Sequence, residues 1–112
     1  MASAEEVLAQ IDATKAKTEE NSGSLTTAAS SVDETFAQAG AARAKVEELA
    51  DQLGGMGIHD KAGVAGGVVQ KIGEAEQAAT ALKSQVENLQ TAVGRIRTLL
   101  DEAYAEAQSL AG

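Results

Sequence analysis

The residues that could perform acid–base or metal chemistry are few, and His59-Asp60 is the first pair to consider. A histidine beside a carboxylate can act as a general base or supply part of a metal site. His59 is the only histidine, however, and the chain contains no cysteine, so a transition metal would lack further ligands of the usual kinds. We interpret His59 as a turn residue and Asp60 as the N-cap of a following helix. We therefore expect no catalytic residue, no cofactor and no metal ion.

A second candidate is the glycine-rich segment that contains Gly54, Gly55 and Gly57, which could cradle a phosphate group. Phosphate-binding loops lie between a strand and a helix and carry a lysine or an acidic residue at a defined spacing. No strand pattern precedes these glycines, so we interpret them as a turn. Adjacent acidic pairs such as Glu19-Glu20 point about 100° apart on a helix and do not converge on a substrate. The sequence thus predicts a protein that is not an enzyme.

The charge of the chain limits the classes of partner. The formal net charge is −8, from 17 acidic and 9 basic residues, and the basic residues form no stripe. Such a balance disfavours binding to nucleic acids and to anionic membranes. The N-terminus has neither the basic nor the apolar region of a secretory signal peptide. We expect a cytoplasmic protein, or one secreted without a cleaved signal peptide.

Apolar and small residues recur at alternating steps of three and four in both halves of the chain. The first ladder comprises Leu8, Ile11, Lys15, Thr18, Ser22, Leu25, Ala29, Val32, Phe36, Ala39, Arg43, Val46, Ala50 and Leu53. The second comprises Val68, Ile72, Ala75, Ala79, Leu82, Val86, Leu89, Val93, Ile96, Leu100, Ala103, Ala107 and Leu110. This period is typical of helices that pack along a coiled-coil seam. We predict an all-α fold, a long antiparallel two-helix hairpin that forms one domain over residues 1–112.

The helices are predicted at about residues 4–53 and 61–110, with a turn at about residues 54–60 that begins at Gly54. Ser3 is the predicted N-cap of the first helix. Residues 21–24 have low helix propensity and form either a kink in a continuous helix or a loop. Because the ladder keeps its phase through this segment, we favour a continuous or kinked helix.

Details of the hairpin stay open at this point. Facing residues could have numbers that add up to 111, which places Phe36 opposite Ala75, or to 118, with a longer connection. Lys15 and Arg43 lie on the seam itself. They either select the register or the partner, as buried polar groups do in coiled coils, or extend outward to Glu19 and Glu47.

Apolar residues beside the ladders suggest a further interface. One hairpin cannot cover both its seam and these flanks, so we expect a second hairpin to complete a homodimeric four-helix bundle, or a second small helical protein to bind there. The predicted interface residues are Val7, Leu49, Val69 and Leu99. We expect a non-enzymatic helical interaction or assembly module.

The plan also resembles that of the Trp-X-Gly family of small helical hairpins, which are substrates of type VII secretion. At the turn, where that family has Trp-X-Gly, this chain has Leu53-Gly54-Gly55. Near the C-terminus, where the family carries Tyr-X-X-X-Asp/Glu, Tyr104 is followed four residues later by Gln108. The Ala-rich sequence without proline is also similar to small uncharacterised actinobacterial helical proteins. The resemblance implies a secretion substrate or its partner as the alternative function.

Overall fold

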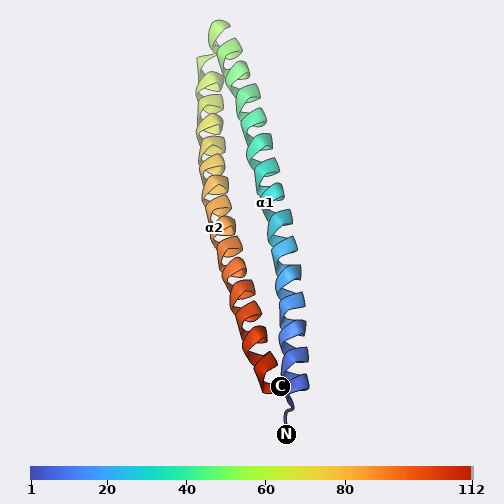
Figure 1. Ribbon diagram of the computed structural model, residues 1–112. Coiled ribbons are helices and arrows are strands. Elements are labelled where there is room, and N and C mark those ends of the chain that lie inside the picture. Colours follow the sequence, from blue (N-terminus) through green and yellow to red (C-terminus); the bar gives the residue numbers. More distant parts are fainter. Residues whose placement is uncertain (112) are drawn as a thin grey trace. The chain divides into compact units, whose positions relative to one another are not determined.

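The computed structural model describes residues 1–111 and consists of two long helices (Figure 1). Helix α1 spans Ala4–Gly55 and helix α2 spans His59–Ala111, and the described residues contain no strand. The predicted all-α hairpin is therefore confirmed, with helix ends within two residues of those expected. Each of two compact units combines a segment of α1 with a segment of α2. Unit 1 contains Met1–Ala28 and the chain from Val86 onward, and unit 2 contains Ala29–Gln85.

Helix α1 begins as the sequence predicts. The backbone N–H of Glu6 donates a hydrogen bond of 3.1 Å to the Ser3 hydroxyl. Glu5 and Glu6 occupy the first turn, where negative charge interacts favourably with the helix dipole. Ser3 is thus the N-cap of the helix.

The segment of low propensity at residues 21–24 is helical throughout, so α1 runs without interruption past Gly23. A Cβ atom added to Gly23 would meet no atom within 4 Å beyond its neighbours and its own helical backbone. We expect Gly23→Ala to stabilise the protein by up to about 1 kcal/mol, because alanine has the higher helix propensity and reduces the entropy of the unfolded chain. Thermal unfolding followed by circular dichroism measures the change, and a lower melting temperature would contradict a continuous helix.

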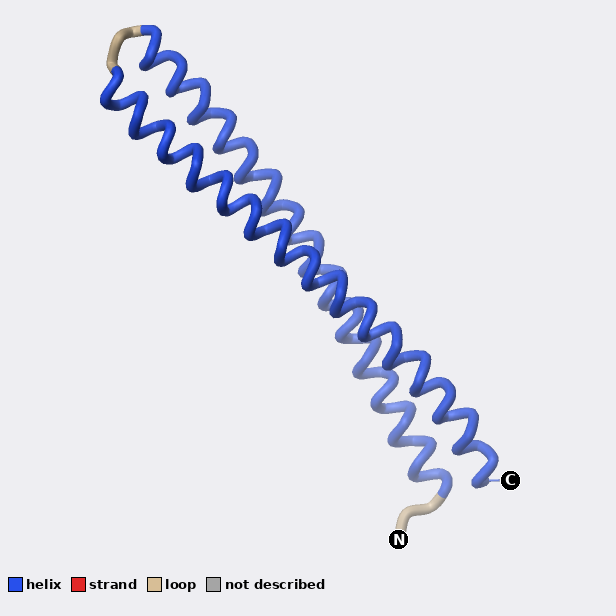
Figure 2. The backbone as a smooth tube through the Cα atoms, turned by 90° about the vertical axis from the view of Figure 1, so that its left-hand side faces the viewer, coloured by secondary structure: helices blue, strands red, loops and turns tan. Residues whose placement is uncertain are grey.

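The connection between the helices is short and has a defined geometry (Figure 2). Gly57 has a φ angle of +77°, which favours glycine. The N–H of Ile58 donates to the Leu53 carbonyl at 2.9 Å, and that of Gly57 donates to the Gly54 carbonyl at 3.1 Å. This pair of bonds is a Schellman motif with Gly57 at C′. The prediction that the turn begins at Gly54 was wrong, because α1 continues through Gly54 to Gly55.

Asp60 also differs from its prediction. Helix α2 begins at His59, so Asp60 lies inside the first turn, and the Ile58 carbonyl accepts a hydrogen bond of 3.1 Å from the N–H of Ala62. Its carboxylate still lies near the positive end of the helix dipole. Asp60 therefore interacts favourably with the helix dipole but is not the N-cap.

On α1 the predicted seam is confirmed at every position except Phe36. The other residues of the first ladder are buried or partly buried, whereas Phe36 is 44% exposed. Thr18, in unit 1, is only 6% exposed, and its hydroxyl donates to the Thr14 carbonyl at 2.9 Å. That local bond satisfies the hydroxyl, so a threonine can lie in the seam without a partner from α2. Phe36 does not fill the core of unit 2 as the sequence predicted.

On α2 one of the two predicted rows lies in the seam, and a different row lies there in place of the other. The row that contains Ala79, Val86 and Ala107 is buried as predicted, each of these residues being at most 8% exposed. The second buried row lies one residue further along than predicted: Val69, Glu76, Lys83, Gln90, Arg97 and Tyr104 are buried or partly buried. The predicted row is instead exposed at Val68, Ala75, Leu82, Leu89, Ile96 and Leu110. A polar row thus faces α1, and a row of leucine, isoleucine and valine does not.

The register agrees with the second alternative, but the longer connection expected with it is wrong, because α2 begins at His59. In unit 2 Arg43 pairs with Glu76, and in unit 1 Lys15 lies over the ring of Tyr104. The residue numbers of each pair add up to 119, close to the predicted alternative of 118 and far from 111. Phe36 is therefore not opposite Ala75.

Candidate interaction surface

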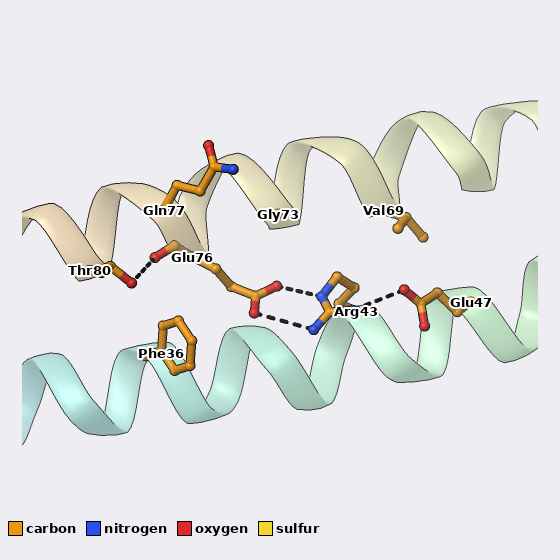
Figure 3. A pocket seen from close by; sticks show the side chains of 8 residues that line it. All are labelled: Phe36, Arg43, Glu47, Val69, Gly73, Glu76, Gln77 and Thr80. Carbon is orange, nitrogen blue, oxygen red and sulfur yellow. Dashed lines mark hydrogen bonds and ion pairs between the residues drawn. The ribbon is translucent and has the colours of Figure 1, made fainter.

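The polar row of α2 forms ion pairs with α1, and these pairs explain why the seam is displaced. The first pair involves Arg43 of α1, in unit 2. Its Nε lies 2.5 Å from Glu76 Oε1, and its Nη2 lies 3.4 Å from Glu76 Oε2. Arg43 Nη1 also contacts Glu47 Oε1 at 3.0 Å, so the guanidinium lies between two carboxylates (Figure 3). The hydrogen bonds to Glu76 and then to Glu47 raise the pKa of Arg43. Of the two open interpretations, Arg43 thus pairs across the seam and also along α1.

Other charged residues of the polar row pair in the same way. In unit 2 Lys83 Nζ lies 2.6 Å from Asp33 Oδ1. In unit 1 Arg97 Nε forms an ion pair with Glu19 Oε1 at 2.5 Å and makes no hydrogen bond. Each contact joins α1 to α2, and the charged groups of the polar row therefore select the face that α2 turns toward α1.

Lys15 contacts both an acidic and an aromatic side chain within unit 1. Its Nζ lies 2.8 Å from Asp101 Oδ1 and 5.2 Å from the centre of the Tyr104 ring. The hydrogen bond to Asp101 raises the pKa of Lys15 above its ordinary value of 10.5, so the ammonium group is charged at neutral pH. Asp101 thus pairs with Lys15 on the other helix, and Arg97 pairs with Glu19.

These contacts define an ion-paired side of each unit. In unit 2 it includes a hollow of about 480 Å³ that is lined by Phe36, Arg43, Glu47, Val69, Gly73, Glu76, Gln77 and Thr80 (Figure 3). Phe36 forms part of this wall instead of a core. In unit 1 the ion-paired side carries Lys15, Glu19, Arg97 and Asp101.

The opposite side of unit 2 is apolar. A hollow of about 390 Å³ lies there, and its lining residues are Val46, Leu49, Leu53, Lys61, Val64, Ala65 and Val68. Leu49 follows Glu47 by two residues, and Val64 precedes Gly73 by nine residues. Both separations correspond to about half a helical turn, so these residues face away from the ion-paired side. We call this surface the apolar side of unit 2.

Unit 1 has an apolar side of the same construction. Its hollow of about 340 Å³ is lined by Asn21, Ser24, Leu25, Leu89, Ala92, Val93 and Ile96. Asn21 follows Glu19 by two residues and Ala92 precedes Asp101 by nine, the same half-turn separations as in unit 2. Each unit therefore has one side closed by ion pairs and one side on which apolar residues remain exposed.

The exposed apolar surface is large for a chain of this mass. Leu82, Leu89, Ile96 and Leu99 are 47–53% exposed, and Val64 is 70% exposed. No side chain among the described residues is fully buried. Val64 and Leu82 belong to unit 2, and Leu89, Ile96 and Leu99 belong to unit 1.

The predicted interface residues fall on both sides. Leu49 and Leu99 are each 50% exposed, and Val7 is partly buried in unit 1. Val69 is partly buried in the wall of the ion-paired hollow of unit 2. The interface prediction did not include Leu82, Leu89 or Ile96, because the sequence placed these residues in the seam.

The remaining candidates show no constellation of functional groups. His59 and the three turn glycines lie at the connection, where His59 begins α2 and Gly57 forms the C′ residue. Within residues 1–111, no three potential metal ligands of the His, Cys, Asp or Glu type lie close enough to hold an ion. Neither of the two described helices has a stretch apolar enough to cross a lipid bilayer.

The residues of the family resemblance are also placed. Leu53-Gly54-Gly55 form the last turn of α1, Tyr104 lies against Lys15, and Gln108 is exposed. No protein-family model, curated protein or solved structure matches this chain.

Proposed function

We propose that this protein is a non-enzymatic helical interaction or assembly module in which the apolar side of each unit receives a further helix. The observation that supports this most is the division of each unit into two sides. The ion-paired side pairs charged groups within the hairpin, whereas leucine, isoleucine and valine residues on the other side are 40–70% exposed. A further helix laid along the apolar side would complete a bundle and remove these residues from water.

The proposal is tested by placing charges on the apolar side. We expect Leu49→Glu combined with Leu99→Glu to dissociate the assembly into helical monomers, because both residues are half exposed and contribute little to the hairpin seam. Light scattering measures the mass, and circular dichroism measures the helix content. An assembly whose mass and helix content do not change would exclude the apolar side as the interface.

The matched control places the same charges elsewhere on both helices. Ala41→Glu combined with Ala105→Glu adds two carboxylates at exposed positions away from the apolar side. We expect this variant to keep the mass of the original assembly. If both double variants dissociate equally, the added charge and not the surface is responsible.

Secretion by a type VII system is the second candidate, and the observation in its favour is the two-helix hairpin that the family resemblance implies. We expect the chain to appear in the culture medium of a host with an intact type VII apparatus and to stay in the cells of a strain that lacks it. Immunoblotting of medium and cell fractions, with a cytoplasmic protein as the lysis control, measures this. Retention in both strains would remove the candidate.

A further inference from the structure

The apolar side of unit 2 also carries positive charge. Lys61 is the charged residue that lines its hollow. Lys45 precedes Leu49 by about one helical turn, and Lys71 follows Val64 by about two turns, so both lysines lie beside the same apolar residues. All three lysines are exposed, and none of them forms an ion pair with a residue that the structure describes. Their ammonium groups are therefore available to a partner.

The acidic residues near this hollow mostly point away from it. Most are rotated by about 80° or more around their helix from Leu49 or Val64, namely Glu48, Asp51 and Glu74. Asp60 is rotated by only about 40° from Val64, and its carboxylate also lies near the positive end of the α2 dipole. The border of the hollow is thus more basic than acidic, although the whole chain carries a net charge of −8.

The register of unit 2 places the lysines at two levels along the hollow. Arg43 pairs with Glu76, so the numbers of facing residues add up to about 119 in this unit. Lys45 on α1 and Lys71 on α2 therefore lie within about one turn of each other along the hairpin. Lys61 precedes Lys71 by ten residues and lies about 15 Å closer to the turn. A helix laid in the hollow would meet positive charge at both of its ends.

We propose that the apolar side of unit 2 binds an amphipathic helix of another protein whose apolar stripe is flanked by acidic residues. This inference rests on the proposed function and names the partner for one unit. The apolar stripe covers Leu49, Val64 and Val68, which are 40–70% exposed. One acidic residue of the partner pairs with Lys61, and another, about three turns away, pairs with Lys45 or Lys71.

Other occupants of an apolar surface fit these observations less well. The hollow of about 390 Å³ lies between two helices, a shape that suits a third helix better than a planar bilayer. An anionic membrane would also be repelled by the net charge of −8. A two-fold dimer through this side would bring the same basic border of both copies together, which like charges oppose.

Two synthetic peptides and the full chain provide the test. Both peptides have about 18 residues, the same leucine stripe and a side-chain cross-link, because free peptides of this length are only marginally helical. One peptide has glutamates beside the stripe, and the other has lysines. We expect the glutamate peptide to bind at least about tenfold more tightly in fluorescence anisotropy, since its flanking charges attract the lysines of unit 2. The net charge of −8 alone favours the opposite order, so tighter binding of the lysine peptide would overturn the proposal.

Charge reversal on the chain tests the same contacts from the other side. A variant with Lys45→Glu, Lys61→Glu and Lys71→Glu should prefer the lysine peptide, and its circular dichroism spectrum should not change, because these residues form no ion pair among those described. For the single change Lys61→Glu we expect binding of the glutamate peptide to weaken by about threefold or more.

Lys17→Glu is the matched control for Lys61→Glu, because it changes the net charge equally. Lys17 lies in unit 1, where its Nζ is 3.2 Å from Glu20 Oε2. We expect this variant to bind the glutamate peptide with an affinity within about twofold of that of the natural chain. Equal weakening by Lys17→Glu and Lys61→Glu would show that net charge and not the border of the hollow determines the affinity, and would overturn the proposal.

The remaining outcomes separate this inference from the proposed function. If Leu49→Glu weakens both peptides but the lysine variants bind as the natural chain does, unit 2 still receives a helix and the acidic partner is overturned. If neither peptide binds at about 1 mM, the acidic partner is also overturned, whereas the mass of the Leu49 and Leu99 variant still decides the proposed function. Binding to phosphatidylserine vesicles without binding to the glutamate peptide, or a dimer of the chain that excludes this peptide, would replace the acidic helix with a membrane or a second copy.

Discussion

Val86→Asp is expected to destabilise the hairpin by about 3 kcal/mol, a large part of the 5–15 kcal/mol that typically separates folded from unfolded domains. Val86 is only 6% exposed and belongs to the row of α2 that both the sequence and the structure place in the seam. An aspartate there would have to lose its hydration or its charge, and its side chain is too short to reach the solvent. Urea unfolding followed by circular dichroism measures the change.

The control for this substitution is Thr91→Asp, because threonine has nearly the same shape as valine. Thr91 is exposed, and its hydroxyl bonds only to the Glu87 carbonyl at 3.2 Å. We expect Thr91→Asp to change the free energy of unfolding by less than about 0.5 kcal/mol. If the two variants were equally stable, Val86 would not be buried between the helices.

The second large effect is expected at the connection, where Gly57→Ala should cost about 1–2 kcal/mol. The φ angle of +77° places the residue in the left-handed region, where a Cβ atom approaches the following carbonyl. The bonds from Gly57 and Ile58 back to Gly54 and Leu53 depend on this conformation. The melting temperature measured at fixed concentration reports the loss.

Gly54→Ala is the matched comparison, since Gly54 lies three residues earlier in the same glycine-rich segment. It is helical, and an added Cβ would have no other atom within 4 Å. Alanine should therefore stabilise α1 by up to about 1 kcal/mol at this position. Opposite signs at residues 54 and 57 are the expected result, and equal signs would contradict the Schellman motif.

The two glycines also illustrate what the sequence could not specify. Gly54, Gly55 and Gly57 are all able to adopt a positive φ, so composition identifies the turn but not the residue that ends the helix. By contrast, Ser3 followed by two glutamates was sufficient to predict the start of α1, because only one residue nearby could accept the first backbone N–H. A helix end can therefore be predicted from sequence where only one nearby residue is able to form it.

The seam of α2 shows a similar limit at the level of packing. Rows through Leu82 and through Lys83 both fit the heptad, and apolar character favoured Leu82. Apolar residues indicate that something covers them, but not whether the cover belongs to the same chain. The pairs Arg43–Glu76 and Lys83–Asp33 involve partners more than 30 residues away, so no local pattern on α2 predicts them. The predicted interface omitted Leu82, Leu89 and Ile96 for the same reason, since their apolar character had assigned them to the seam.

The composition of the two units has a consequence for the order in which the chain folds. Unit 2 is one continuous segment that contains its own turn, so its two helical parts can associate by closing short loops near Gly57. Unit 1 joins the first and last segments of the chain, and all of unit 2 lies between them. Loop closure costs about 0.6 kcal/mol more for each doubling of loop length, and contacts that close long loops form more slowly. The hairpin should therefore assemble from the turn toward its ends, and Lys15 and Asp101 should be among the last residues to meet and the first to separate.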